Sequence, residues 1–458
     1  MNRRDFVVSS AWLLAGRRLA KLDPRVRELE QLVSGPVFVP VDSSVLVYNE
    51  RYAHLHPLAV VRPRGSHDVQ AVVRWGRRRG IRVIPCSGGH SYAGYSTGSG
   101  VVLDLSTLQS VRLAGTTAVI GPGARLYDVY AALAARGGTI PAGSCPTVGF
   151  GGLVLGGGVG LASRKLGTTS DNVVSMTVAT GDGKLLEVDA THHPDLFWGL
   201  RGGGGRNFGI VTSFRVRVTP VTSGAWFNAT YDWSAAPDVV GAWQRWCSTT
   251  SPNFFTLCSL GSGRTLQVFG QFWGSEAAMV AALPSFVKSN ARLRTGASSY
   301  LDLMLRWAGC LGESPQQCRT PRPTTFAAKS DYVAKPMPTQ AVRTLQDWLE
   351  RRKGSGSVLM DSYGGALRKT KGAFQHHDVI CSLQELAYWD GVATESLQWL
   401  RGLHAALRPY VTGAAYVNYI DPELTDWTHA YYGSNYARLV SVRERYDPDR
   451  VFRFRQAI

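Results

Sequence analysis

In the first half of the chain, the hydrophobic residues of some segments recur with the period of a helix and those of other segments with the period of a strand. Valines recur three and four residues apart between residues 66 and 79, where Ser66 can cap the first turn and Gly80 can end the last, so a helix is predicted there. Apolar and polar residues alternate from 210 to 218, which predicts a strand with one buried face. Shorter segments of the same two kinds are found at 81–85, 101–105, 119–120, 126–133, 173–180 and 185–188. Residues 35–220 are therefore predicted to form one α+β domain.

The second half of the chain is richer in tryptophan and phenylalanine, and its predicted elements are longer. Helices are predicted at 339–352 and 394–407, and strands at 358–367 and 379–389. These elements predict a second domain, over residues 221–410, in which a sheet is backed by helices. Residues 411–458 are predicted to pack back on the first domain, because their last helix turns Leu439, Val442 and Tyr446 to one side.

The stretch from Gly143 to Gly160 follows neither period. Eight of its 18 residues are glycine and none is charged. Each interior glycine destabilises a helix or strand by about 0.5–1 kcal/mol, so the stretch is predicted to be neither, but a backbone that another group approaches closely. Further glycine-rich turns occur at 87–91 and 198–209, and the backbone N–H groups of 87–91 can form an anion-binding nest.

Composition narrows the class of protein. The 458 residues are 44% hydrophobic and include 13 tryptophans, which is typical of a globular fold. No stretch of ~20 apolar residues predicts a membrane span. The net charge is +17, but the basic residues are scattered, and their densest runs, at 77–79 and 351–353, lie at predicted helix ends, where cations suit the helix dipole. A nucleic-acid partner is therefore not predicted.

The N-terminus resembles an export signal. Arg3 and Arg4 are followed by Phe6 and a short apolar run, as in a twin-arginine leader, and residues 1–30 are interpreted as that leader. This interpretation predicts a protein exported by the twin-arginine route, either periplasmic, envelope-associated or secreted. A basic amphipathic helix is the alternative.

The cysteines carry no zinc-type spacing. The seven are Cys86, Cys145, Cys247, Cys258, Cys310, Cys318 and Cys381. If Cys145 is committed to a ligand, six remain, enough for three disulfides in an oxidising compartment. Cys310 and Cys318 flank a short polar loop and are the first candidate pair, the alternative being six free buried thiols.

The glycine clusters limit the ways in which a nucleotide cofactor can be held. A Rossmann site needs Gly-x-Gly-x-x-Gly between a strand and a helix, and a P-loop needs Gly-x4-Gly-Lys-Ser/Thr. The clusters fit neither spacing. They indicate instead a nucleotide held by backbone nests between apolar walls.

Taken in order along the chain, these clusters resemble the berberine-bridge-enzyme-like branch of the vanillyl-alcohol-oxidase flavoproteins. The matching motifs are Ser87-Gly-Gly-His90-Ser, Gly143-Ser-Cys145-Pro-Thr-Val-Gly-x-Gly-Gly, Arg201-Gly-Gly-Gly-Gly-x-Asn207-Phe-Gly, Tyr-x-Asn-Tyr-x-Asp421 and Tyr-Tyr-Gly-x-Asn435. The resemblance implies a particular α+β fold. It consists of a PCMH-type FAD-binding domain of two α/β subdomains and a substrate domain with an antiparallel sheet backed by helices.

The resemblance also implies how FAD is held. His90 is similar to the histidine that bonds the 8α-methyl group of the flavin ring, and Cys145 to the cysteine that bonds carbon 6, so a bicovalent FAD is predicted. The turn at 87–91 would cradle the pyrophosphate, and residues 209–211 would lie along the adenine. The full set of predicted FAD contacts is Ser87, Gly88, Gly89, His90, Ser91, Cys145, Val148, Gly151, Gly152, Gly157, Gly209, Ile210, Val211, Asn418 and Asn435.

Two positions near the predicted flavin bear on the reaction. Val148 matches the family position where valine goes with oxidases and leucine with dehydrogenases that exclude oxygen, so the resemblance implies an oxidase. Leu153 departs from the family, which commonly has histidine there, and this puts the fine geometry beside the flavin in doubt.

The base that the resemblance implies is a tyrosine, whose ordinary pKa of ~10 must then be lowered. Tyr419 is the first candidate and Tyr416 the second, since on a strand the two would point to opposite faces. Three further residues, each equally open to a structural role, lie on strands that face the substrate in the family: Asp361, Tyr363 and Gln384.

One histidine pair suggests a metal site. Adjacent histidines on a strand point to opposite faces, so a structural role is predicted for His376 and His377.

The predicted function is FAD-dependent oxidation of an alcohol group in a carbohydrate, an aromatic alcohol or a secondary metabolite, with O2 reduced to H2O2. The partners are thus a small-molecule substrate and O2. Two alternatives stay open. One is a flavin dehydrogenase that uses another acceptor, and the other is a catalytically silent binding protein of the cell envelope.

Overall fold

The computed structural model describes residues 23–39 and 47–458. Residues 1–22 of the predicted leader therefore lie outside the described residues. The end of that segment belongs to α1 (Pro24–Leu32), whose Val26 and Leu29 are fully buried against α2 (Ser66–Arg79). Those last residues are thus part of the packed protein.

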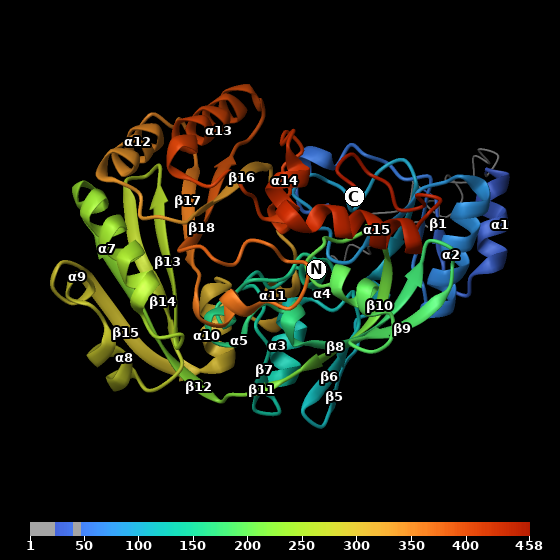
Figure 1. The fold of residues 1–458 in the computed structure, drawn as a ribbon, viewed down its shortest axis with the longest axis horizontal. Helices are drawn as coiled ribbons and strands as arrows, with labels where there is room; N and C mark the ends of the chain where they lie inside the picture. Colours follow the sequence, from blue (N-terminus) through green and yellow to red (C-terminus); the bar gives the residue numbers. More distant parts are fainter. Residues whose placement is uncertain (1–22, 40–46) are drawn as a thin grey trace, which may run out of the picture.

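The first half of the chain contains two sheets, which lie on the right in Figure 1. The smaller has four strands in the order β1-β2-β4-β3, with β2, β4 and β3 parallel. Its strands are β1 (Val37–Phe38), β2 (Ala59–Val61), β3 (Val83–Cys86) and β4 (Val101–Asp104). Helices α1 and α2 cover one face of this sheet, and their valines and leucines form one core with it.

The predicted helix at 66–79 is confirmed as α2, and it ends at Gly80 in the left-handed conformation, with φ of 62°. The capping role of Ser66 is wrong. Gly65 is the N-cap, and the Ser66 hydroxyl instead donates to Thr212 Oγ1 at 2.9 Å, which ties the start of α2 to a strand of the second sheet.

The second sheet has five antiparallel strands in the order β5-β6-β10-β8-β9. Their bounds are β5 (Val111–Ala114), β6 (Thr117–Ile120), β8 (Val173–Thr180), β9 (Leu185–Asp189) and β10 (Gly209–Arg217). The predicted alternation in β10 is confirmed, because Phe214 and Val216 are fully buried while Arg215 and Arg217 are exposed. The helices of this region are α3 (Leu126–Ala134), α5 (Ser163–Leu166) and α6 (Pro194–Gly199), and a two-stranded sheet joins β7 (Gly138–Thr139) to β11 (Thr219–Pro220).

The glycine-rich stretch contains a short helix, α4 (Phe150–Leu155), where none was predicted. Phe150 and Val154 are fully buried in the core, and the carbonyls of Ala124 and Pro122 accept from the first two N–H groups of the helix at 2.8 and 2.9 Å. Tertiary burial and these two acceptors outweigh the low helix propensity of glycine.

The second half of the chain forms a seven-stranded antiparallel sheet in the order β15-β12-β14-β13-β17-β18-β16, on the left in Figure 1. Its strands are β12 (Ser223–Tyr231), β13 (Phe254–Gly261), β14 (Thr265–Phe272), β15 (Arg292–Ser299), β16 (Phe326–Val333), β17 (Gly356–Ser362) and β18 (Cys381–Tyr388). The helices of this half are α7 (Ala236–Thr249), α8 (Glu276–Ala282), α9 (Ser285–Ser289), α10 (Tyr300–Trp307), α11 (Pro315–Arg319), α12 (Thr339–Glu350) and α13 (Thr394–Leu407).

Helices α7, α12 and α13 cover the outer face of this sheet. Successive strand residues point to opposite faces. In β17, Val358 and Met360 pack under the helices, whereas Leu359 and Asp361 point to the other face. That inner face is turned toward the first half of the chain.

The chain ends with α14 (Trp427–Tyr432) and α15 (Tyr436–Tyr446), which lie over the first half in Figure 1. Leu439, Val442 and Tyr446 of α15 share a core with β6, β8 and β10. The segment before α14 is not the expected strand, because Val417–Tyr419 forms a 3₁₀ turn.

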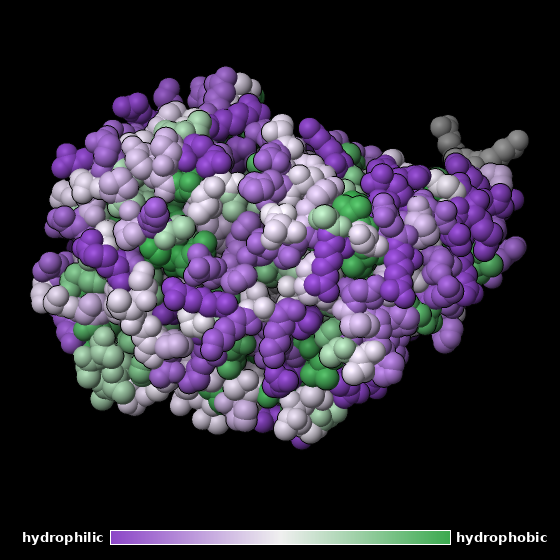
Figure 2. Space-filling model, in the orientation of Figure 1, coloured by the Kyte–Doolittle hydropathy of each residue, from purple (hydrophilic) through white to green (hydrophobic). Residues whose placement is uncertain are grey.

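The face shown in Figure 2 is mostly hydrophilic, with small separate hydrophobic areas. Among the helices of residues 23–39 and 47–458, none combines the length and the apolar character needed to cross a bilayer.

Candidate active site

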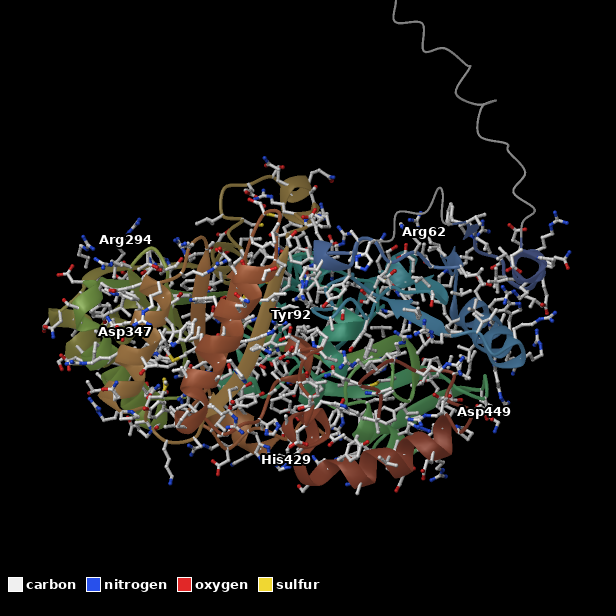
Figure 3. All side chains as sticks on the ribbon, turned by 90° about the horizontal axis from the view of Figure 1, so that it is seen from above. Arg62, Tyr92, Arg294, Asp347, His429 and Asp449 are labelled. Carbon is white, nitrogen blue, oxygen red and sulfur yellow. The ribbon has the colours of Figure 1, made fainter. Side chains whose placement is uncertain are left out.

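A cavity of about 510 Å³ lies between the two halves of the chain. Tyr92, one of its lining residues, is at this junction in Figure 3. One wall comes from the glycine-rich segments of the first half, and the opposite wall from the inner face of the seven-stranded sheet. Residues 416–420 close it from the C-terminal part.

The turn at 87–91 follows β3 directly and forms part of the first wall. The backbone N–H groups of Gly88, His90 and Ser91 donate to no acceptor within the described part of the chain. Unpaired N–H groups on a cavity wall fit an anion such as a pyrophosphate. Ser87 contributes less directly, because its hydroxyl donates to the Pro122 carbonyl.

The only arginine or lysine among the described lining residues is Arg206. Its Nη1 donates to the Tyr95 carbonyl at 2.7 Å and its Nη2 to the Arg453 carbonyl at 2.9 Å. Burial lowers its pKa to about 9, so the guanidinium stays mostly charged near neutral pH. This positive charge, which has no carboxylate partner in the residues described, also suits an anionic ligand.

His90 is held on this wall by two contacts. Its Nε2 and Thr147 Oγ1 are hydrogen-bonded at 3.0 Å, and its ring stacks on Tyr48 with centroids 3.9 Å apart. Burial, with a smaller contribution from the charge of Arg125, lowers the pKa of His90 to about 3. The imidazole is therefore neutral near pH 7 and carries a free electron pair, as a nucleophile must.

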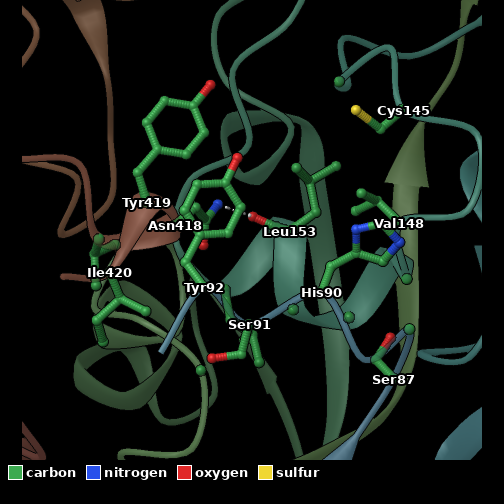
Figure 4. A pocket seen from close by; sticks show the side chains of 18 of the residues that line it. Ser87, His90, Ser91, Tyr92, Cys145, Val148, Leu153, Asn418, Tyr419 and Ile420 are labelled. Carbon is green, nitrogen blue, oxygen red and sulfur yellow. Dashed lines mark hydrogen bonds between the residues drawn. The ribbon is translucent and has the colours of Figure 1, made fainter. Parts of the chain in front are cut away.

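Cys145 lies on the same side of the cavity as His90 and Val148 (Figure 4). Its side chain is exposed, and because the residue lies deep between the two halves, the surface it exposes is that of the cavity. The same position, away from bulk water, raises the pKa of its thiol. The thiol is thus free to react with a group held in the cavity.

Most predicted FAD contacts come together on this wall. Those that line the cavity are Ser87, Gly88, Gly89, His90, Ser91, Cys145, Val148, Gly151, Gly152, Gly209, Ile210, Val211 and Asn418. Gly157 and Asn435 do not. A Cβ on Gly157 would meet the Phe374 ring at 2.9 Å, and Asn435 Nδ2 donates to the Ala373 carbonyl at 3.2 Å, so both serve packing around residues 373–374.

Tyr416 and Tyr419 both line the cavity, contrary to the expectation of opposite faces. In a 3₁₀ turn, residues three apart lie on one side, and their rings make an edge contact at 5.0 Å. Tyr419 also stacks on Tyr92 at 5.4 Å, across the cavity from His90 in Figure 4.

The two phenols differ in hydrogen bonding. Tyr416 Oη accepts from the N–H of Gly158 at 3.0 Å, from that of Val159 at 3.3 Å and from Asn418 Nδ2 at 2.9 Å. These bonds lower its pKa, but burial is the larger effect and raises it to about 12. The Tyr419 hydroxyl bonds to no described residue, and burial raises its pKa well above 10.

The sheet wall changes from apolar to polar across its strands. At one end lie Phe269, Phe255, Leu257 and Leu359, with Trp307 stacked on Phe269 at 5.5 Å. At the other end lie Asp361, Gln384 and Tyr388, and Gln384 Nε2 donates to the Tyr92 hydroxyl at 2.9 Å. These apolar residues stand in no sequence motif, although the strand alternation around β13 indicates that Phe255 and Leu257 share one face of the sheet.

The predicted disulfide pair and the predicted histidine pair lie away from the cavity. All seven cysteines are free thiols in the structure, so the expected Cys310–Cys318 disulfide is not formed, although their sulfurs and a carboxylate oxygen of Glu313 lie within 4.8 Å of one another. His376 is not on a strand. Its Nε2 is hydrogen-bonded to the Ala430 carbonyl at 2.6 Å.

Two family models match the chain: "FAD binding domain" over residues 57–189 and "Berberine and berberine like" over residues 415–458. The uncharacterized FAD-linked oxidoreductase YgaK of Bacillus subtilis is 31% identical over 434 residues, which cover 90% of this chain and 94% of that protein. The berberine bridge enzyme-like Cyn d 4 of Cynodon dactylon is 30% identical over 469 residues, which cover 93% of this chain and 89% of that protein.

Solved structures of similar proteins have the same fold as this chain. BBE-like 1 of Physcomitrella patens has a TM-score of 0.89 at 28% identity, covering 95% of this chain and 98% of that one. A chitooligosaccharide oxidase has a TM-score of 0.86 at 26% identity, covering 95% and 99%. Wild-type Phl p 4.0202, a glucose dehydrogenase, has a TM-score of 0.88 at 25% identity, covering 95% and 99%. These similarities confirm the predicted fold class.

Proposed function

The chain belongs to the berberine bridge enzyme-like family of FAD-linked oxidoreductases, and from this premise we propose that it is an oxidase that converts a ring-bearing alcohol to a carbonyl compound and reduces O2 to H2O2. The observation that carries the substrate class is the apolar strip on the sheet wall of the cavity, next to a short polar end.

The wall of the first half fits FAD. The unpaired N–H groups of Gly88, His90 and Ser91 and the charge of Arg206 suit the pyrophosphate. No protein atom lies within 4 Å of the position that a Cβ on Gly152 would take, which leaves room for the cofactor. We propose that His90 and Cys145 bond the flavin ring covalently. Bound FAD supplies the acceptor for a hydride from the alcohol carbon.

We propose that residues 35–220 and 411–458 together hold FAD and that residues 221–410 bind the substrate. We also propose export by the twin-arginine route, on the strength of the arginine pair near the N-terminus. Binding of the flavin before export would suit that route, because it carries folded proteins.

Tyr416 and Tyr419 are proposed to contact the reacting end of the substrate, since both line the cavity beside the polar residues of the sheet. Burial raises the pKa of both phenols above the ordinary value. A phenol with a raised pKa is protonated near neutral pH and is a poor proton acceptor. Their contribution is therefore to orient the substrate.

The apolar strip favours an aromatic ring over a sugar. Phe269, Phe255, Leu257 and Trp307 offer ring faces and methyl groups, and the Trp307 N–H is already bonded to Gln271 Oε1 at 3.2 Å, so this end has few groups to bind sugar hydroxyls. Burying a ring there gains roughly 1.5–3 kcal/mol. An unpaired sugar hydroxyl would instead cost about 1–3 kcal/mol.

Peroxide release is expected to have a kcat/KM at least about tenfold higher with cinnamyl and benzyl alcohols than with cellobiose or chitobiose. A tenfold difference in kcat/KM corresponds to about 1.4 kcal/mol, which is less than the combined effects of ring burial and unpaired hydroxyls given above. A coupled peroxidase assay measures it, with Phe269→Ala expected to raise KM for the aromatic alcohols. Preference for the sugars would contradict the substrate class. Flavin bleaching without peroxide would instead indicate the dehydrogenase alternative.

Val148 lines the cavity beside His90, where the family resemblance places the oxygen-reactive face of the flavin. Val148→Leu is expected to slow reoxidation of the reduced flavin by O2 by about tenfold or more, because the added methylene fills space that O2 must enter. A tenfold slower rate corresponds to an increase of about 1.4 kcal/mol in the activation free energy. Stopped-flow mixing of reduced protein with O2 measures this rate. Anaerobic reduction by alcohol should stay the same, and equal reoxidation rates would remove Val148 from this role.

A further inference from the structure

Two cysteines and a glutamate meet outside the cavity, in the connection between α10 and β16. Two sulfurs and a carboxylate oxygen, from Cys310, Cys318 and Glu313, lie within 4.8 Å of one another. Among residues 23–39 and 47–458, no other three histidine, cysteine, aspartate or glutamate side chains come together in this way. None of the three lines the cavity, so the oxidation proposed above gives them no part.

The backbone after α10 turns twice to bring the first two side chains together. Gly309 is left-handed, with φ of 68°, and the Cys310 N–H donates to the Leu305 carbonyl at 2.8 Å. Gly312 is also left-handed, with φ of 86°, and the Glu313 N–H donates to the Cys310 carbonyl at 2.9 Å. These two turns place Glu313 beside Cys310.

Helix α11 returns the chain to the same place. The Ser314 hydroxyl accepts from the Gln317 N–H at 3.3 Å, and Gln317 Oε1 accepts from the Ser314 N–H at 2.8 Å, so a capping box starts the helix. The Cys318 N–H then donates to the Ser314 carbonyl at 3.1 Å. The buried thiol of Cys318 lies 3.8 Å from the carbonyl oxygen of Cys310.

We propose that Cys310, Glu313 and Cys318 bind one zinc ion. Zn²⁺ binds thiolate sulfur at about 2.3 Å and carboxylate oxygen at about 2.0–2.2 Å in a tetrahedral arrangement, so neighbouring ligand atoms lie roughly 3.5–3.8 Å apart. Three atoms within 4.8 Å of one another need only small movements to reach this geometry. The two thiol protons are released to solvent when the metal binds, and water occupies the fourth position.

Arg322 balances the charge of this site. Its Nη2 donates to the two carboxylate oxygens of Glu313 at 2.9 and 3.1 Å, which leaves lone pairs on both oxygens for a metal. Two thiolates and a carboxylate carry three negative charges, and Zn²⁺ with the guanidinium carries three positive ones. The Arg322 side chain is 69% exposed and Glu313 is half-buried, so a metal ion can enter from solvent.

The position of Glu313 favours a metal ion over a disulfide. A disulfide uses only the two sulfurs, and both cysteines are free thiols in the structure. It would leave the nearby carboxylate without a function, whereas a cation is shared by all three groups. A protein that folds before twin-arginine export would bind the metal in the cytoplasm, where thiols stay reduced.

Zinc would fasten a long connection to the rest of the protein. Residues 308–325 contain one helix, of five residues, and Tyr127 of α3 is the only buried side chain besides the two cysteines in their apolar cluster among the described residues. A bound metal supplements such a small core. Trp307 and Thr324, at the two ends of this connection, line the cavity. The metal would therefore stabilise the segment that joins two parts of the cavity wall.

The test is zinc uptake by the tag-free full chain with its flavin bound, after reduction and removal of metal by a chelator. Calorimetric titration with zinc chloride, and elemental analysis after gel filtration, should give about one zinc per chain. Cys310→Ser and Cys318→Ser should each weaken binding by about 100-fold or more, and Glu313→Gln by about tenfold or more. Loss of a group that only supports a ligand already costs about 10–100-fold.

Two controls make the test specific to this site. Cys247→Ala removes a buried thiol on α7, outside the cluster, and should bind zinc as the wild type does. Cobalt(II) in place of zinc should give a thiolate-to-metal charge-transfer band in the difference spectrum, and Cys310→Ser should lose it, which separates sulfur ligands from surface histidines. Reduced wild type that takes up no zinc, or cysteine variants that bind zinc as tightly as the wild type, would overturn the site.

Thermal stability gives a second measurement that does not depend on enzyme activity. Excess zinc should raise the Tm of the wild type, because it binds the folded state. Glu313→Gln changes a half-buried side chain on a loop, so it should still fold and show a smaller rise. The ratio of flavin to protein absorbance should be the same with and without zinc, since no ligand lines the cavity. An equal rise in Tm in Glu313→Gln and both cysteine variants would show that zinc binds elsewhere.

Discussion

Acid precipitation of the purified protein is expected to leave the yellow colour in the pellet if, as we propose, two covalent bonds hold the FAD. His90 and Cys145 both line the cavity on the same wall, one as a neutral imidazole and the other with its thiol exposed to the cavity. An imidazole nitrogen and a thiolate are nucleophiles that an electron-poor flavin ring can accept. Flavin absorbance in the pellet and the supernatant, with the mass of the intact protein, measures the result.

Variants separate the two bonds. His90→Ala and Cys145→Ala should each keep the flavin through the remaining bond, whereas the double variant should release nearly all of it into the supernatant. Cys247→Ala removes a buried thiol on α7 that does not line the cavity, and should retain the flavin as the wild type does. Free FAD in the wild-type supernatant would exclude any covalent attachment, and release by either single variant would reduce the number of bonds to one.

Gly88→Ala is expected to prevent flavin incorporation and to lower the free energy of unfolding by at least about 1–3 kcal/mol, the usual cost of overpacking. A Cβ on Gly88 would lie 2.3 Å from the backbone nitrogen of Gly149 and 2.8 Å from its Cα, where two glycine-rich segments of the cavity wall meet. The nearest atoms to this Cβ all belong to the backbone, so no flexible side chain could move to make room for it.

Two matched variants locate this effect. Gly65→Ala adds the same methyl group where no atom lies within 4 Å, outside the cavity, so it should keep the flavin and lose at most about 1 kcal/mol of stability, the cost of alanine at the N-cap of α2. Gly152→Ala also meets no protein atom but lies on the cavity wall, so it should fold normally and bind less flavin. Melting curves and the ratio of flavin to protein absorbance give both quantities. Normal flavin content in Gly88→Ala would show that the two segments can separate.

Much of the fold follows from local sequence. The β8 and α13 ranges agree with the predicted ones, because their periods are regular and turns bound them clearly. The short helix in the glycine-rich stretch could not be predicted in this way. Its stability comes from the carbonyls of Ala124 and Pro122 and from the burial of Phe150, which depend on the tertiary fold.

Some residues of the candidate site could likewise be predicted from local sequence, and others could not. Residues in compact motifs, such as His90 and Cys145, were predicted because the motif itself is local. Tyr416 and Tyr419 were identified as residues, but the prediction that they point to opposite faces was wrong, because the segment was expected to be a strand and forms a 3₁₀ turn. Asp361 stood in no motif. It was named only as one of three residues equally open to a structural role, and the structure alone shows that it is the one carboxylate among the described residues of the cavity wall.

The two-sided construction of the cavity has a consequence for biosynthesis. Its wall draws on residues from Tyr48 to Phe454, so the flavin has no complete binding surface until nearly the entire chain is synthesised and its halves have docked. Contacts between such distant segments form late and slow folding. Covalent attachment of the flavin would then occur only in polypeptides that have completed this late step. Once the bond is made, a partly unfolded molecule would retain its flavin, and the cavity could refold around it.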